Sequence, residues 1–287
     1  MTIEEKVGLL FLYPGPDDPW DLIKKGLVTG VLHAVSASRT RALQAATQDS
    51  RLRIPLLFVD DVVHGFRTTF PIGIAMAASW DLPAIETAAR VAAIEARASG
   101  VTWTYAPMVD VVRDPRWGSV EGGSEDPYLV ARVKHANLRG FHEAPTPLLA
   151  CTKHYVAYGA PQGGLDYYSA ELSDRTLFHT YLPPFKAAVD TEIGCVMATY
   201  IDIAGVPVHA SRRLLRDTLK TQFGFDGFVV SEFGAARDLM NYRVASNLTV
   251  AAGLSLSLRA SSLRASTSTW PIPRTRSSSP TRSVSGS

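Results

Sequence analysis

The stretch of this sequence best suited to chemistry runs from Arg113 to Gly118 (RDPRWG) and is followed by Glu121 and the pair Glu125–Asp126. Carboxylates accept hydrogen bonds from sugar hydroxyls, guanidinium groups donate them, and an indole covers the apolar face of a pyranose. A loop with this composition therefore fits sugar recognition. Asp114 and Arg116 also fit a second interpretation, in which an Arg–carboxylate network only pins a long loop.

Other polar residues occur where apolar runs of the sequence end. They are Asp60, Asp61 and His64, then Asp110 and Asp114, then Lys153 and His154, then Tyr200, and finally Ser231 and Glu232. An ammonium at the end of an apolar strand, as at Lys153, costs desolvation free energy unless a partner or ligand is present. The repetition of polar strand ends predicts one shared site.

The apolar runs predict the elements that position these residues. The runs span 30–35, 54–60, 101–111, 148–158, 193–200 and 228–231, and they are continuous rather than alternating, as in parallel strands covered on both faces. Helix signals lie between them. One helix begins at Asp81 and Pro83 with apolar residues at three- and four-residue spacing, and Ser211 caps another that ends before Gly224.

Strands that alternate with helices indicate an α/β fold, either a (β/α)8 barrel or a doubly wound open sheet. Polar residues at successive strand ends favour the barrel, because its strands converge on one mouth at their C-terminal ends. No GxGxxG or phosphate-binding loop follows any strand, which argues against nucleotide binding. No metal or organic cofactor is implied.

Composition excludes several classes of protein. The 287 residues are 46% hydrophobic and 20% charged with a net charge of +2, as in an ordinary globular protein rather than a nucleic-acid binder. No apolar run reaches the roughly 18 residues of a membrane span.

Cys151 and Cys195 lie in apolar runs, and we expect two reduced, buried thiols. Glu4 and Glu5 occupy the place of a basic signal-peptide region, so localisation stays open: cytoplasmic by default, extracytoplasmic if a segment precedes this sequence.

The composition changes near residue 253. Asp238 is the last acidic residue, and 253–287 is dominated by Ser, Arg, Thr and Pro. Such a segment buries too little apolar area to offset its conformational entropy. We therefore expect a barrel domain at 1–252 and a disordered low-complexity tail at 253–287, with Ala252 to Leu258 (AGLSLSL) as a last, weakened strand. An unrelated or frameshifted extension explains the tail better than RNA binding does.

Five ordered motifs resemble glycoside hydrolase family 3, in its β-glucosidase type. MTIEEKVGLL resembles the opening helix of the family, FVDDVVHG its strand-two motif, and RDPRWG with the following acids its DPRWGR…E…ED signature. CTKHYVAYG resembles its Lys-His motif and FGFDGFVVSEFGA the strand that carries its nucleophile. The resemblance covers about residues 1 to 250 and implies a (β/α)8 barrel of the TIM type with a degenerate last strand and helix.

The resemblance also implies roles for residues. Those matching family positions that hold the sugar are Asp61, Arg116, Lys153, His154 and Tyr200, and the nucleophile position is Glu232. Asp114, Trp117 and His64 are expected one layer behind the sugar, although His64 also fits direct contact.

Three departures from the family pattern bear on activity. Glu232 stands where the family has Asp, which moves the carboxylate by about 1.5 Å, and a misplacement of about 1 Å can cost about a hundredfold in rate. Ser119 stands where the family signature has a sugar-binding Arg. The acid/base Glu of many members comes from a second domain, and no His follows His154 at the alternative acid/base position.

Two functions follow from these observations. One is a retaining β-glucosidase that hydrolyses terminal β-linked glucosyl residues of a glucoside or short oligosaccharide, with its acid/base supplied by a partner chain or a missing domain. The other is a non-catalytic sugar-binding barrel or an inactive truncated product.

Overall fold

The structure, a computed structural model, describes residues 1–259. Its main sheet has seven parallel strands in the order β1-β2-β3-β4-β5-β6-β9. Their bounds are β1 Leu12–Tyr13, β2 Gly30–Leu32, β3 Leu57–Asp60, β4 Trp103–Thr104, β5 Leu149–Tyr155, β6 Cys195–Ala198 and β9 Phe228–Ser231. An antiparallel hairpin pairs β7 Asp202–Ile203 with β8 Val206–Pro207. The predicted α/β architecture is confirmed.

Helices connect the parallel strands. The α-helices are α1 Ile3–Gly8, α2 Trp20–Lys25, α3 Ala37–Ala46, α4 Gly73–Ala78, α5 Leu82–Ala98, α6 Pro127–His142, α7 Asp174–Thr176, α8 Pro183–Val189, α9 Ala235–Asn241 and α10 Leu248–Arg259. A π-helix, η7, spans Arg213–Gln222, and shorter turns lie at Thr47–Asp49, Pro115–Trp117, Val120–Gly122, Gln162–Gly164, Leu177–Tyr181 and Val208–Ala210.

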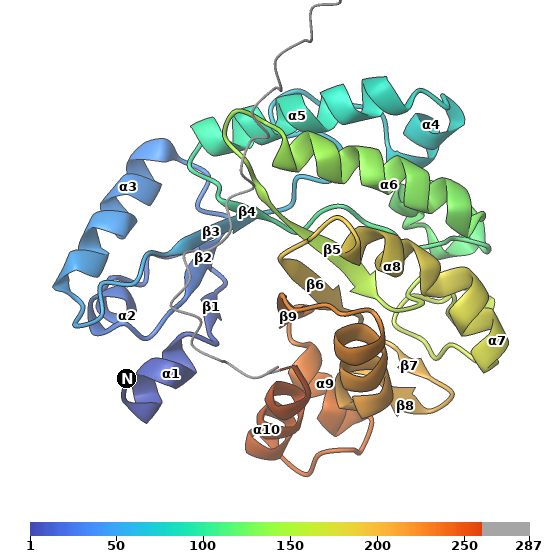
Figure 1. Cartoon of the computed structure of the whole chain (residues 1–287). Coiled ribbons are helices and arrows are strands. Elements are labelled where there is room, and N and C mark those ends of the chain that lie inside the picture. The colour runs from blue at the N-terminus through green and yellow to red at the C-terminus, as the bar shows by residue number, and fades with distance from the viewer. Residues whose placement is uncertain (260–287) are drawn as a thin grey trace, which may run out of the picture.

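The sheet curls into part of a barrel with helices on its outer side (Figure 1). Helices α3, α5, α6 and α8 line this outer side, and β1 and β9 form the two edges of the sheet within residues 1–259. All six pairings are parallel, so the carboxyl ends of the strands face the same way. Each of the six apolar runs in the sequence contains one strand. Strand β1 was not predicted, because two residues are too few to form a recognisable pattern.

The predicted helix signals are confirmed. The Asp81 carboxylate accepts a hydrogen bond from the Ala84 amide at the start of α5, and Ile85, Ala89, Ala92 and Ala96 are buried. Helix α6 approaches α5 closely at Gly140, where a Cβ would lie 2.6 Å from the Cβ of Ala89. The close contact buries the small-residue face of α5 against α6.

The helix at Arg213–Gln222 also follows its sequence signals. The Leu214 amide donates to the Ser211 hydroxyl at 3.3 Å, and Leu215 and Leu219 are fully buried. Gly224 follows the helix with a φ of 75°, a left-handed conformation that suits glycine. This helix precedes β9, which carries Glu232 at its end.

The expected strand at Ala252 to Leu258 is wrong, because this segment belongs to helix α10. The side-chain carbonyl oxygen of Asn247 accepts a hydrogen bond from the Val250 amide at the start of the helix, and Ala251 packs in a small cluster with Leu239. Alternating Leu and Ser mimicked a strand, but both Leu and Ala also favour helices. The remainder of the expected tail, 260–287, lies outside the described residues. No helix within 1–259 is long and apolar enough to cross a membrane.

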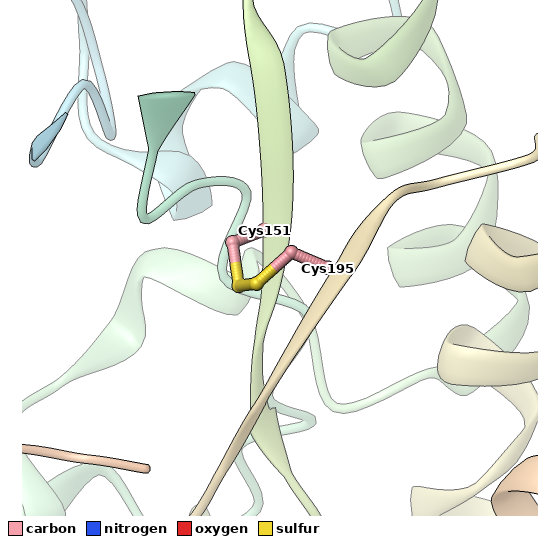
Figure 2. The surroundings of a disulfide bond; sticks show 2 residues. All are labelled: Cys151 and Cys195. Carbon is pink, nitrogen blue, oxygen red and sulfur yellow. A yellow bond between two sulfur atoms is a disulfide. The ribbon is translucent and has the colours of Figure 1, made fainter. Parts of the chain in front are cut away.

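The prediction of two reduced thiols is also wrong, because Cys151 and Cys195 form a disulfide (Figure 2). Cys151 on β5 pairs in register with Cys195 on β6, and their Cα atoms lie 4.3 Å apart. Spacing along the chain gives no hint of this pairing, which is set by the register of two neighbouring strands. Both residues are completely buried in a cluster that includes Trp103 and Met197.

Candidate active site

Four of the residues predicted to form the site lie at the carboxyl ends of strands in the same sheet. Asp61 follows β3, Lys153 lies near the end of β5, Tyr200 follows β6 and Glu232 follows β9. The Lys153 ammonium lies 2.5 Å from the Asp61 carboxylate, although these residues are 92 positions apart in the sequence. Lys153 is buried, so this carboxylate is the charge partner that an ammonium at a strand end requires.

His154 links two carboxylates inside the protein. Its Nδ1 lies 3.0 Å from Asp110, and its Nε2 lies 3.0 Å from Glu232. Asp110 also accepts a hydrogen bond from the backbone amide of His154. Burial lowers the pKa of His154, but the charge of Asp110 and hydrogen bonds to both carboxylates outweigh it, so the pKa is raised. A protonated ring can donate to both carboxylates at once.

Glu232 is fixed by backbone and side-chain contacts. Its amide donates to the carbonyl of Ala198 at 3.3 Å, which continues the β6–β9 pairing. Its Oε2 accepts a hydrogen bond from the Phe233 amide at 2.7 Å. Burial raises the pKa of Glu232, but the hydrogen bond and charge of His154, the Phe233 amide and the charge of Lys153 together lower it to about 2. The carboxylate is therefore ionised at neutral pH.

Aromatic rings form one wall around these charges. The ring of Tyr158 packs edge-on against His154, with centroids 4.9 Å apart, and lies 6.0 Å from Tyr200. The Tyr200 hydroxyl donates to the carbonyl of Phe233 at 2.9 Å. Burial and the charge of Glu232 raise the pKa of Tyr200, so its hydroxyl keeps its proton. Tyr200 thus reaches from β6 to the residue after Glu232.

The loop predicted to bind sugar divides into an exposed part and a buried part. The Arg116 guanidinium binds Asp114 at 2.6 Å, and its side chain is 72% exposed. Trp117 is buried, with its ring 4.9 Å from that of Tyr158, and its indole N–H donates to Asp166 at 3.0 Å. Trp117 therefore supports the aromatic wall from behind. The Asp114–Arg116 contact joins residues two positions apart, and the role of Arg116 in sugar binding stays a prediction.

His64 lies beside the same loop rather than within the charged cluster. Its Nδ1 is 3.0 Å from Oε1 of Glu121, whose other oxygen accepts a hydrogen bond from the Gly73 amide. The buried ammonium of Lys134 donates to the carbonyl of Glu121 at 2.6 Å, and burial lowers the pKa of Lys134 to about 8. These contacts tie the segment after β3 to the loop after Trp117.

Three residues near the site, Asp110, Tyr158 and Asp166, receive no individual role from the sequence. Asp110 belongs to the strand-end pattern, but nothing local shows that it binds His154. Tyr158 lies near the end of the Lys-His motif and Asp166 follows it, at distances along the chain that predict no contact. The only signal available for them is their closeness to that motif. Within the described part of the chain, no three His, Cys, Asp or Glu side chains are grouped so as to hold a metal ion.

Comparison with known proteins identifies the family. The profile of the Glycosyl hydrolase family 3 N terminal domain matches residues 2–268. The chain belongs to glycosyl hydrolase family 3. It is 40% identical over 258 residues to the "Periplasmic beta-glucosidase" of Salmonella typhimurium, covering 86% of this chain and 34% of that protein. It is 37% identical over 207 residues to a "Beta-xylosidase" of Formosa agariphila, covering 66% of this chain and 29% of the relative.

Solved structures of the family share the fold. The β-glucosidase from Listeria innocua in complex with isofagomine superposes with a TM-score of 0.84 at 35% identity, covering 90% of this chain and 38% of that one. A mutant of the Listeria enzyme was solved in complex with laminaribiose, again with a TM-score of 0.84. The chain thus spans about a third of the length of these family 3 relatives. The predicted family and barrel-type fold are confirmed.

Proposed function

We propose that this family 3 chain is the barrel portion of a retaining β-glucosidase that removes terminal β-linked glucosyl residues. The observation that carries the proposal is Glu232, an ionised carboxylate at the end of β9 that contacts His154 and lies in the field of Lys153. A retaining glycosidase requires such a carboxylate as its nucleophile. The β-glucosidase relatives support glucose as the sugar.

In the proposed reaction, an oxygen of Glu232 attacks the anomeric carbon while the bond to the leaving oxygen breaks. The leaving oxygen takes a proton from an acid, and the covalent glycosyl-enzyme is later hydrolysed by water. His154 and the Phe233 amide hold the carboxylate in place. Asp61 and Lys153 form a charged pair whose remaining donors and acceptors would bind sugar hydroxyls.

The proton donor is proposed to come from outside this chain. Asp110 is buried against His154, and Asp61 is paired with Lys153, so both are occupied in holding cations. The chain spans about a third of its relatives' length, which leaves room for a donor from a further domain or a partner chain. In this proposal the chain supplies the nucleophile, and the proton donor comes from elsewhere.

A second candidate is a barrel that binds sugar without hydrolysing it. Both oxygens of Glu232 already accept hydrogen bonds from the protein, one from His154 and one from the Phe233 amide. The longer Glu side chain thus folds back onto its own backbone. Arg116 is exposed to solvent and paired with Asp114. Ser119 occupies the position at which the family signature has a sugar-binding Arg, so the site lacks that guanidinium.

The two candidates are separated by hydrolysis of 4-nitrophenyl β-glucoside, whose leaving group departs with little acid assistance. The chain is compared with Glu232→Gln and Glu232→Asp, with folding checked by circular dichroism. Activity that disappears in the Gln variant supports the glycosidase. Activity only in the Asp variant identifies a barrel that binds sugar but is disabled by Glu232, and inactivity of all three folded proteins supports the sugar-binding candidate. The matching β-xyloside tests glucose against xylose, because one relative is a β-xylosidase.

A further inference from the structure

A compact loop stands beside the candidate site and presents exposed apolar side chains. The backbone closes it where the Gln162 amide donates to the Ser169 carbonyl at 3.0 Å. The side chains of Leu165, Tyr167 and Tyr168 are exposed to 60%, 60% and 52%. Three exposed apolar side chains within four positions on an ordered loop are typical of a binding surface.

Asp166 fixes this loop against the buried aromatic wall. Its carboxylate accepts hydrogen bonds from the Trp117 indole and from the Tyr167 amide, both at 3.0 Å. Burial and the nearby Asp166 carboxylate raise the pKa of the Tyr158 hydroxyl. A Cβ on Gly164 would lie 2.9 Å from the Trp117 amide, so the loop backbone also sits directly on the segment containing Trp117. The loop is therefore held by groups that are themselves buried.

Tyr167 is the loop side chain that reaches the site. Its ring lies 5.1 Å from the ring of Tyr200 at an interplanar angle of 80°, and 6.3 Å from that of Tyr158. Its φ of 63° is uncommon for a residue other than glycine, and such conformations persist where surrounding contacts fix them. The neighbouring Tyr168 makes no ring contact with an aromatic side chain of the described residues.

The position of Tyr167 relative to the charges determines what it can bind. The inner groups, Lys153, Asp61 and Glu232, are polar and suit the hydroxyls and anomeric carbon of the sugar being cleaved. Tyr167 lies further out: its ring contacts that of Tyr158, which in turn packs against His154, and its side chain is 60% exposed. An exposed aromatic face fits an apolar surface, such as a phenyl ring or the face of a second sugar.

We infer that Tyr167 is a specificity-determining residue that stacks on the group attached to the glucosyl unit, and that Asp166 is the residue that positions it. The inference rests on the proposed function, because the inner residues must first hold a glucosyl unit. Ligands with a flat or extended attached group then gain affinity over ligands with a small one. The gain depends on the ring of Tyr167 and not on its hydroxyl.

Calorimetric titration of the full chain with two stable ligands tests this inference. Phenyl 1-thio-β-D-glucopyranoside carries a ring, and methyl β-D-glucopyranoside does not. In Tyr167→Ala we expect the preference for the phenyl ligand to fall about 2- to 10-fold, the range of a single aromatic contact. Tyr167→Phe keeps the preference, and so does the matched control Tyr168→Ala, which removes a similarly exposed ring from the same loop. Asp166→Asn lowers the preference in part, because the Tyr167 ring is held less firmly. The unchanged preference of Tyr167→Phe shows that the Tyr167 hydroxyl plays no part.

The outcomes that overturn the inference differ from those that overturn the proposed function. If the wild-type chain prefers the phenyl ligand and Tyr167→Ala preserves that preference, Tyr167 is not the stacking residue. An equal loss in Tyr168→Ala would assign the effect to the loop as a whole and also reject the inference. If the folded wild-type chain binds neither glucoside, the proposed function fails, and the inference fails with it.

Discussion

Two groups of charged residues in this chain look alike in sequence and differ in the structure. His154 with Asp110 and Glu232 forms a buried network at the ends of β5 and β9, whereas Arg116 with Asp114 forms an ion pair on an exposed loop. Buried charges must be matched by partners, because they have lost their hydration, but exposed pairs compete with water and salt. The comparison shows that burial, not residue type, determines which charges the fold depends on.

The largest expected effect is the loss of a partner within the buried network. Asp110→Ala leaves His154 without the carboxylate that contacts its Nδ1, and removing one member of a buried ion pair costs about 3–5 kcal/mol. Urea denaturation should show this decrease in the free energy of unfolding. Asp110→Asn, which keeps the shape and an acceptor, should lose less. Equal stability of the Ala variant and the wild type would show that the network contributes nothing.

The disulfide should have the next largest effect on stability. Cys151 and Cys195 close a loop with a sequence separation of 44 residues, and a disulfide of this kind stabilises by about 2–4 kcal/mol. Complete reduction, confirmed by thiol titration after denaturation, should therefore lower the melting temperature. The double variant Cys151→Ala with Cys195→Ala is the control and should not respond to reductant. An identical melting temperature for oxidised and reduced wild type would contradict the expectation.

The pH dependence of stability tests whether the site holds Glu232 ionised. The pKa of Glu232 falls from 4.5 to about 2 on folding, so its contribution is complete above about pH 4.5 and is lost as the pH falls toward 2. The contribution is up to about 3 kcal/mol. His154 acts in the opposite direction: its raised pKa gives stability that is present below about pH 6.5 and is lost as the pH rises through the folded-state pKa.

Denaturation from pH 7 to 2 measures the contribution of Glu232. The stability difference between the wild type and Glu232→Gln should shrink between pH 4.5 and 2. A difference that stays constant across this range would show that Glu232 is not held ionised by the protein.

The smallest effect is expected for the exposed pair. Arg116→Ala removes a guanidinium that is 72% exposed, and many surface ion pairs contribute nothing measurable to stability. Thermal denaturation at low and high salt should give nearly the same melting temperature for variant and wild type. A decrease comparable to that of Asp110→Ala would remove the distinction between the two regions.

The sequence predicted the elements of the fold well where one pattern was unambiguous. The four residues of β6 are all apolar, as in a buried strand, and α5 combines a capping Asp81 with a regular apolar face. Prediction failed where two patterns overlapped. Residues 252–258 alternate as a strand does, yet packing of Ala251 against Leu239 and capping by Asn247 favour a helix.

The site could be predicted in composition but not in its contacts. Lys153 and His154 lie near the end of β5 and Glu232 follows β9, and parallel strands bring such ends to one side of the sheet. Nothing in the sequence shows that His154 lies between Asp110 and Glu232, since these contacts join residues from three separate segments. The roles in sugar binding remain predictions for all of these residues.

The sequence by itself determined the family, the alternation of strands and helices, and the polar residues at the strand ends, because these depend on local patterns of side-chain type. The tertiary structure decided which of these residues meet. It pairs Lys153 with Asp61 across 92 positions and joins Cys151 to Cys195, while Arg116 stays in solvent. Strand register and burial set those distances, and both are properties of the assembled sheet rather than of any one segment.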